Sequence, residues 1–284
     1  MKRIIPILVG IAVFGSAMSR EYLPSKEELE AFLKTKTLVV LEDNPMLMYN
    51  TLIEEAMKEN WTLTEFDFIS VKEFMEKFSD PQYSFLIMNQ VKFEGDESKP
   101  VYNFLSVWLG DANAKDFEVL PEICGVPLSY RSVYEDSYNY KLGTMLRFIQ
   151  NHINLIYNNP EIISANIYKH YNENMGDIKK KTLYLIKDEL ADNINTIAKI
   201  KKVYPYKVKI VTREEVKATI DSKDEDVVFL HKIGPEGTRL KARCYKIIAG
   251  AADANFYYFD MHMISDKHPD SLLLSDLKKI AKGK

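Results

Sequence analysis

Two carboxylates follow apolar stretches that we interpret as strands, where acid–base chemistry or ligand binding is possible. Asp43 ends the stretch that starts at Leu38, and Asp188 ends the matching stretch that starts at Leu183. Open α/β sheets bind ligands beyond the carboxyl ends of their parallel strands. Asp188, however, directly precedes a predicted helix, and capping that helix explains an aspartate there. We therefore favour the capping interpretation and keep both residues as weak catalytic candidates.

The loop His231–Gly237 follows another predicted strand and supplies two further weak candidates, His231 and Glu236. A histidine can act as a general acid or base, but it needs a nucleophile or an orienting partner nearby. The sequence places no such partner beside His231, and its proline and two glycines also fit an ordinary turn. Catalysis by this histidine with a nearby carboxylate is therefore an alternative hypothesis.

A polar face is predicted on the last strand of each half, because successive residues of a strand point to opposite faces. In the stretch Tyr257–Met263 one face is apolar and the other is semi-polar, and Phe117–Ile123 shows the same alternation. The semi-polar residues form a candidate ligand or partner surface: Glu118, Glu122, Tyr258, Asp260 and His262. His262, Asp266 and His268 lack a recognised metal-ligand spacing, so we expect no metal and no cofactor.

Other catalytic and binding motifs are missing from the sequence. It contains no Gly-x-Ser-x-Gly nucleophile elbow, and no glycine-rich phosphate loop follows either predicted first strand. A net charge of −3 and a pI of about 6.0 provide no basic field for nucleic acid. The 28% charged and 46% hydrophobic residues are typical of a globular protein.

The first 19 residues have the pattern of a secretory signal peptide. Lys2 and Arg3 precede an apolar run from Ile4 to Phe14, and small residues follow as far as Ser19. The run is too short to span a bilayer, which takes about 20 residues. We expect cleavage after Ser19 or Ala17 and an exported, periplasmic or extracellular protein without a stable transmembrane segment.

The predicted strands and helix starts that position these residues recur at a nearly constant spacing along the chain. This recurrence predicts a tandem duplication. Leu38 and Leu183 are 145 residues apart, and the capping boxes that start at Ser70 and Thr212 are 142 apart. A further capping box is predicted to start at Ser25. Each copy has the predicted order α-β-α-β-α-β-β-β-α with a mixed sheet, an α/β fold with α+β character at its end. We assign residues 20–159 to the first copy and 160–284 to the second.

Several boundaries within the copies are more specific predictions. The motif Asn44–Pro45 should begin a helix, and long helices are expected at 133–157 and 161–174. The glycine-containing segments 110–113 and 250–255 should form hairpin turns. Cys124 and Cys244 are either an interdomain disulfide, which an exported protein permits, or two buried thiols.

These observations favour an exported, soluble, two-domain binding or adaptor protein of the cell envelope without enzymatic activity. Its partner would be another protein or a small ligand. The alternative is a hydrolase or small-ligand sensor whose site lies at the junction of the two copies. A shared pocket that holds polar side chains from both copies would contradict the first hypothesis and favour the alternative.

Overall fold

The computed structural model describes residues 23–44, 47–164, 166–237 and 241–283. The signal peptide predicted at residues 1–19 lies outside the described residues. Within the described part of the chain, no helix has the length and apolar character needed to cross a membrane.

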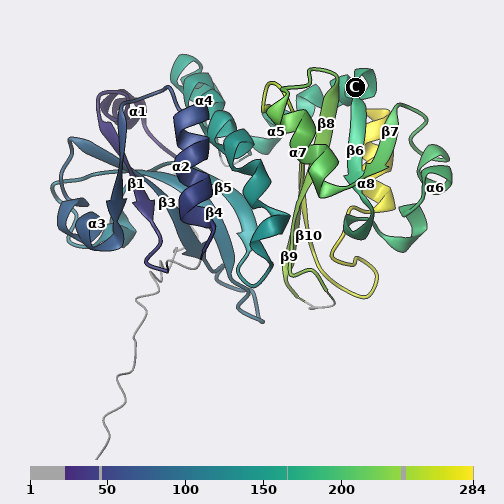
Figure 1. The fold of residues 1–284 in the computed structure, drawn as a ribbon, viewed down its shortest axis with the longest axis horizontal. Helices are drawn as coiled ribbons and strands as arrows, with labels where there is room; N and C mark the ends of the chain where they lie inside the picture. Colours follow the sequence, from purple (N-terminus) through teal and green to yellow (C-terminus); the bar gives the residue numbers. More distant parts are fainter. Residues whose placement is uncertain (1–22, 45–46, 165, 238–240, 284) are drawn as a thin grey trace, which may run out of the picture.

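Two five-stranded mixed sheets lie side by side, one in each half of the chain (Figure 1). The first sheet consists, in spatial order, of β2 (Phe66–Ser70), β1 (Lys36–Leu41), β3 (Tyr83–Val91), β4 (Tyr102–Leu109) and β5 (Glu122–Tyr130). The second sheet consists, in the equivalent order, of β7 (Val208–Val211), β6 (Thr182–Ile186), β8 (Val227–Ile233), β9 (Arg243–Gly250) and β10 (Phe256–Met263). In both sheets the first three strands of this spatial order are parallel to one another. Each of the last two strands is antiparallel to the strand before it in the same order. This shared topology is consistent with a duplication.

Helices cover both faces of the sheets. The α-helices are α1 (Lys26–Phe32), α2 (Tyr49–Asn60), α3 (Val71–Lys77), α4 (Leu142–Asn158), α5 (Tyr168–Glu173), α6 (Ile197–Lys201), α7 (Arg213–Asp221) and α8 (Leu274–Lys282). Short 3-10 turns are η1 (Phe117–Val119), η2 (Glu135–Ser137), η3 (Asn139–Lys141), η4 (Pro160–Ile162), η5 (Asn174–Lys180), η6 (Lys187–Glu189) and η7 (Asp192–Ile194).

Three helices begin at the capping boxes that the sequence predicts. Ser25, Ser70 and Thr212 each accept a hydrogen bond from the backbone N–H three residues later. The glutamate side chain at that later position accepts a hydrogen bond from the backbone N–H of the cap residue, so two backbone donors are satisfied at each helix start. These local predictions are confirmed.

One hydrophobic core is continuous between the two halves. It contains Val39 of β1, Ile149 of α4, Val216 of α7 and Ile247 of β9, all at most 1% exposed. Separate cores fill the outer faces, under α3 in the first half and beside α8 in the second. The inner faces of the two sheets are therefore held together by helices from both halves (Figure 1).

Polar and aromatic contacts reinforce this junction. The rings of Phe148 and Phe256 stack with centroids 3.5 Å apart, and those of Tyr102 and Tyr245 meet edge to face at 5.7 Å. Arg243 donates two hydrogen bonds to Asp96, from Nε at 2.9 Å and Nη2 at 3.1 Å. Burial of this many aromatic rings stabilises the packing of one half against the other.

The first half departs from the prediction around its last strand. Residues Phe117–Val119 form a 3-10 turn, because the Asp116 side chain accepts a hydrogen bond from the backbone N–H of Glu118 at 3.0 Å. The strand begins only at Glu122 and runs to Tyr130, so the predicted strand at 117–123 is wrong. A longer connection therefore replaces the hairpin turn predicted at 110–113. The turn predicted at 250–255 is confirmed by the hydrogen bond from Gly250 N to Asn255 O at 3.0 Å.

Several predicted helix starts are also wrong. Helix α2 begins at Tyr49 rather than at Asn44–Pro45, and Pro45 lies outside the described residues. Its amino end is capped by Glu135, which accepts hydrogen bonds from the backbone N–H groups of Met48 and Tyr49 at 3.1 Å each. The helix predicted at 133–157 starts at 142, after two 3-10 turns. The one predicted at 161–174 is divided between η4 and α5.

The two cysteines are free thiols. Cys124 on β5 and Cys244 on β9 are both buried and unbonded, so the disulfide alternative is excluded. Burial raises the pKa of both thiols, which keeps them protonated.

Candidate functional site

An open cleft lies where the two halves meet, and we call it the junction cleft. Its volume is about 440 Å³, within the range of about 300–1,000 Å³ that is usual for small-molecule sites. The first half lines it with Asn60, Thr62, Leu63, Arg147, Gln150, Asn151 and Asn154, and the second half with Lys223, Ala252 and Asp253. Most of these side chains are amides, hydroxyls or cations, so the walls present hydrogen-bonding groups from both halves.

Helix α4 forms one wall and fixes the turn between β9 and β10. The Arg147 guanidinium donates to the carbonyls of Ala252 and Ala251, the latter at 2.9 Å. One turn further along α4, the Asn151 amide donates to the carbonyl of Asp253 at 2.8 Å. The floor of the cleft, supplied by the second half, is thus tied to a helix of the first.

Gln150 holds the segment between α2 and β2 against the same helix. Its Oε1 accepts from the backbone N–H groups of Thr62 at 2.7 Å and Leu63 at 3.1 Å. Its Nε2 donates to the carbonyl of Asn60 at 2.8 Å. These bonds tie residues 60–63 to α4, and ordering of a site by the protein's own hydrogen bonds reduces the conformational entropy lost on binding.

Lys223 enters the cleft from the carboxyl end of α7. Its φ of +50° is left-handed, a conformation that glycine usually occupies after a helix. Backbone hydrogen bonds from Lys223 N to Ile220 O and from Asp224 N to Thr219 O, at 3.1 and 3.0 Å, hold it there. The ammonium group therefore extends from a fixed backbone position, and the side chain is exposed.

The single carboxylate of the lining is already engaged. Asp253 accepts hydrogen bonds from Asn255 N at 3.0 Å and from the Tyr257 hydroxyl at 2.5 Å. Burial lowers the pKa of Arg147, and the charge of Asp253 partly offsets this effect. The buried Nε of Arg147 has no hydrogen-bond partner among the described residues. Among its charged groups, the cleft thus has two cations and one carboxylate.

A second polar group lies at the carboxyl ends of β6, β7 and β8, where an α/β sheet usually binds its ligand. We call Tyr140, Lys141, Glu189, Arg213 and His231 the junction cluster. Lys141 and His231 are 0% exposed and Glu189 is 7% exposed. Within the described chain, the Lys141 ammonium, Glu189 Oε2 and His231 Nδ1 lack hydrogen-bond partners. Lys141, Glu189 and His231 are thus buried, whereas the Arg213 side chain is 32% exposed.

Charges within the junction cluster act on one another. Burial raises the pKa of Glu189, while the charges of Lys141 and Lys232 oppose that change. Burial also lowers the pKa of His231 well below its usual value, and the charge of Lys141 lowers it further. His231 is therefore neutral near pH 7, with Nε2 hydrogen-bonded to the carbonyl of Pro127 at 3.2 Å.

A small cavity adjoins the cluster. Its volume of about 10 Å³ suits a single water molecule. The lining comprises Leu128, Ser129, Tyr130, Val133, Ser137, Tyr138, Lys232, Ile233, Gly234 and Glu236. It is too small for a substrate, and His231 does not line it.

The four acid–base candidates from the sequence do not form one constellation. His231 is buried between the halves, and Glu236 is exposed on the loop after β8, 3.8 Å from Arg213. Asp188 is exposed in η6, and the cap of the next helix, α6, is Thr196, so the capping role predicted for Asp188 is wrong. Asp43 is exposed after β1 in the other half. The hydrolase hypothesis gains no support from this arrangement.

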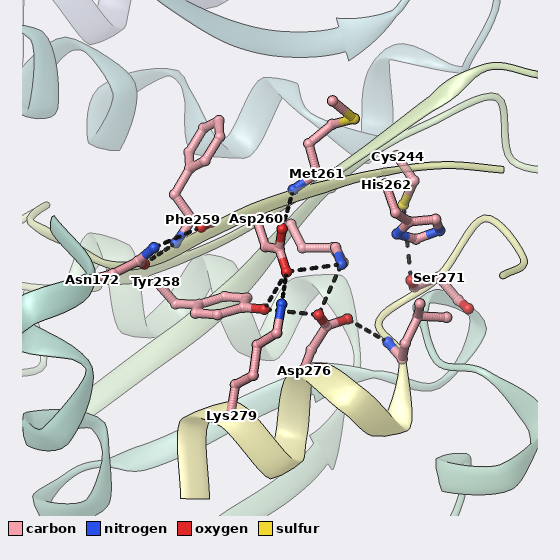
Figure 2. Close-up of polar contacts among 12 residues, drawn as sticks. Asn172, Cys244, Tyr258, Phe259, Asp260, Met261, His262, Ser271, Asp276 and Lys279 are labelled. Atoms are coloured by element: carbon pink, nitrogen blue, oxygen red, sulfur yellow. Dashed lines mark hydrogen bonds and ion pairs between the residues drawn. The ribbon is translucent and has the colours of Figure 1, made fainter. Parts of the chain in front are cut away.

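The predicted polar face of β10 exists, but α8 covers it (Figure 2). The Tyr258 hydroxyl donates to Asp276 at 2.7 Å and to Asp260 at 3.0 Å, and its side chain is 2% exposed. Burial raises the pKa of Asp260, but hydrogen bonding from Lys279 and the charge of Lys246 outweigh it and lower the pKa. The pairing is internal, so Tyr258 is not at a partner surface.

The other predicted surface residues lie apart from these. His262 is half-buried and hydrogen-bonded to the carbonyl of Pro269 at 2.9 Å. Glu118 is exposed in η1, whereas Glu122 is half-buried at the start of β5, where burial raises its pKa. Among the described residues, no group of three histidine, cysteine, aspartate or glutamate side chains is arranged to hold a metal ion.

The sequence reasoning missed the residues of the junction cleft. Arg147, Asn151 and Asn154 recur at helical spacing on α4, which gave a polar stripe in an otherwise apolar helix. That stripe is the signal that could have identified the cleft wall. Lys223 and Asp253 carry no comparable pattern.

Comparisons with known proteins give no relative. No family model, curated protein or solved structure matches the chain.

Proposed function

We propose that the chain is an exported, non-enzymatic binding protein of the cell envelope, and that its ligand is a small polar molecule held in the junction cleft. One observation carries the proposal: a cleft of about 440 Å³ is lined by polar side chains from both halves. A ligand in this cleft combines the non-enzymatic binding role of the first hypothesis with the junction site of the alternative hypothesis. The first 19 residues support the part of the proposal that concerns export.

The lining chemistry supports binding rather than turnover. Asn154 and Lys223 present an amide and an ammonium group, while both oxygens of Asp253 accept hydrogen bonds from the protein itself. Such groups hold a polar ligand by hydrogen bonds, and the pre-formed walls favour recognition. Catalysis of hydrolysis would instead need a base within reach of a bound nucleophile.

Binding is tested on protein purified from the exported fraction of a bacterial host. Native mass spectrometry should detect a bound small molecule, and peptide mapping should find an amino terminus after Ala17 or Ser19. A thermal-shift panel of sugars, amino acids and organic acids then ranks ligands. A protein that carries no small molecule and responds to none of the panel, but captures one envelope protein, would favour the adaptor hypothesis.

A matched pair of variants locates the site. Asn154→Ala removes an exposed amide from the cleft wall, and Asn158→Ala removes an exposed amide one turn further along α4, outside the lining. A hydrogen bond contributes about 0.5–1.5 kcal/mol, so Asn154→Ala should weaken binding by about two- to tenfold. Equal effects of the two substitutions would place the ligand elsewhere.

A further inference from the structure

The junction cleft presents more positive than negative charge to a ligand. Its lining holds two cations, Arg147 and Lys223, and one carboxylate, Asp253. Each oxygen of the carboxylate accepts one hydrogen bond from the protein, from Asn255 N and from the Tyr257 hydroxyl. The charge of Asp253 acts on Arg147, so the lining keeps an excess of one positive charge.

Neither cation forms an ion pair within the described residues. The amino groups of Arg147 bond to two neutral carbonyls, those of Ala251 and Ala252, and its buried Nε has no partner. Because this Nε is buried, a ligand can meet only the two amino groups of Arg147, and each of these donates one of its two hydrogens to a carbonyl.

Lys223 gives a second, independent indication. A lysine at a φ of +50° is less favourable there than glycine, which has no Cβ. Strained backbone positions of this kind cluster at sites of function. Lys223 lines the cleft, and its side chain is the feature that a glycine would lack.

From these observations we infer that the ligand carries one carboxylate, and that Arg147 and Lys223 recognise it. This inference rests on the proposed function. The carboxyl ends of α2 and α7 adjoin the cleft, at Asn60 and Asp221. Their partial negative charge disfavours a phosphate dianion and leaves room for a single charge. Thr62 and Asn154 then face hydroxyl or amide groups of the ligand, as in a sugar acid.

The test uses paired probes that differ in charge alone or nearly so. Galacturonate is compared with galactose, and succinamate with succinamide, by calorimetric titration of the full-length chain purified after export. We expect the acid to bind at least about tenfold more tightly than its neutral counterpart at 20 mM salt. The preference should shrink at 500 mM salt, where charges are screened within about 4–5 Å.

Variants assign the preference to the cleft. Lys223→Gln removes the charge and keeps a polar side chain that is one bond shorter, and should weaken acid binding by about three- to fivefold while leaving the neutral probes unchanged. Lys202→Gln, at the exposed carboxyl end of α6, is the matched control and should change nothing. Unaltered acid binding by Lys223→Gln overturns the inference.

The outcomes separate the inference from the proposed function. Neutral probes that bind as tightly as the acids overturn the carboxylate inference and leave the binding function intact. If no acid or neutral probe binds and no small molecule is present in the purified protein, both fail together.

Discussion

The Lys246 ammonium lies 2.8 Å from the Asp276 carboxylate, and each side chain is only 1% exposed. Asp276 also accepts hydrogen bonds from the Tyr258 hydroxyl and from Leu273 N, at 2.7 Å each. The attraction within a buried ion pair and the hydrogen bonds to its remaining lone pairs offset the cost of desolvating both charges. A single buried charge without its partner has no such compensation. This pair therefore fixes α8 on β9 and β10 rather than forming a ligand site.

Removal of one partner should destabilise the fold strongly. Lys246→Met leaves Asp276 charged and buried, and we expect the free energy of unfolding to fall by about 3–5 kcal/mol in urea titrations. Lys279→Met is the control, because its side chain is 55% exposed and its ion pair with Asp260 should contribute no more than about 1 kcal/mol. Similar losses of unfolding free energy from the two substitutions would show that burial does not determine how strongly these ion pairs stabilise the fold.

The adjacent acids Asp96 and Glu97 allow the same comparison, of a buried with an exposed ion pair, at the contact between the two halves. Asp96, 6% exposed, accepts two hydrogen bonds from Arg243, whereas Glu97, 69% exposed, pairs with Lys241. Asp96→Asn should lower the free energy of unfolding by about 1.5–3 kcal/mol, since it weakens a charge-assisted, bidentate contact. Glu97→Gln should change it by less than about 1 kcal/mol. A reversed order would show that the buried contact does not stabilise the junction.

Much of the fold could be predicted because its signals are local. The three capping boxes depend on residues three apart, and the buried strand Leu38–Leu41 depends on a short apolar run. Alternation at 117–123 imitated a strand, but the Asp116 side chain stabilises a 3-10 turn there. Periodicity alone does not detect that local competition between side chain and backbone.

The candidate site could not be predicted from the sequence, because the contacts that form it are not local. Its walls depend on hydrogen bonds between distant residues, such as Gln150 with Asn60 and Asn151 with Asp253, which are 90 and 102 positions apart. No sequence pattern marks such pairs. The sequence instead drew attention to Tyr258 and His231, whose polarity serves buried contacts with Asp276 and with the carbonyl of Pro127.

The stability of the protein should depend on pH through His152. Burial lowers the pKa of His152 from 6.5 to about 4, and the charge of His170 adds to this effect. Between those values the unfolded chain binds a proton that the folded chain does not, so the free energy of unfolding falls as the pH falls. The loss should amount to about 1–3 kcal/mol between pH 7 and pH 4.

Substitution separates this contribution from general acid sensitivity. His152→Gln should flatten the dependence of the urea midpoint on pH between 7 and 4. His268→Gln, which removes an exposed histidine, should leave the slope unchanged. Parallel curves for the natural chain and His152→Gln would exclude His152 as the titrating group.

The loop after β8 provides a test by steric exclusion. A Cβ on Gly234 would lie 1.8 Å from Oδ1 of Asp270, a carboxylate that pairs with Lys232 at 2.9 Å and accepts from Glu236 N at 2.7 Å. The Lys232 and Asp270 side chains are 4% and 2% exposed, so the carboxylate cannot withdraw without leaving a buried charge. Gly234→Ala should therefore cost at least about 2 kcal/mol in unfolding free energy. Gly237→Ala, three residues later with no atom within 4 Å of its added Cβ, should cost far less in the same titration. Equal stability of the two variants would mean that the loop moves away from Asp270 at little cost, and that this carboxylate does not hold it.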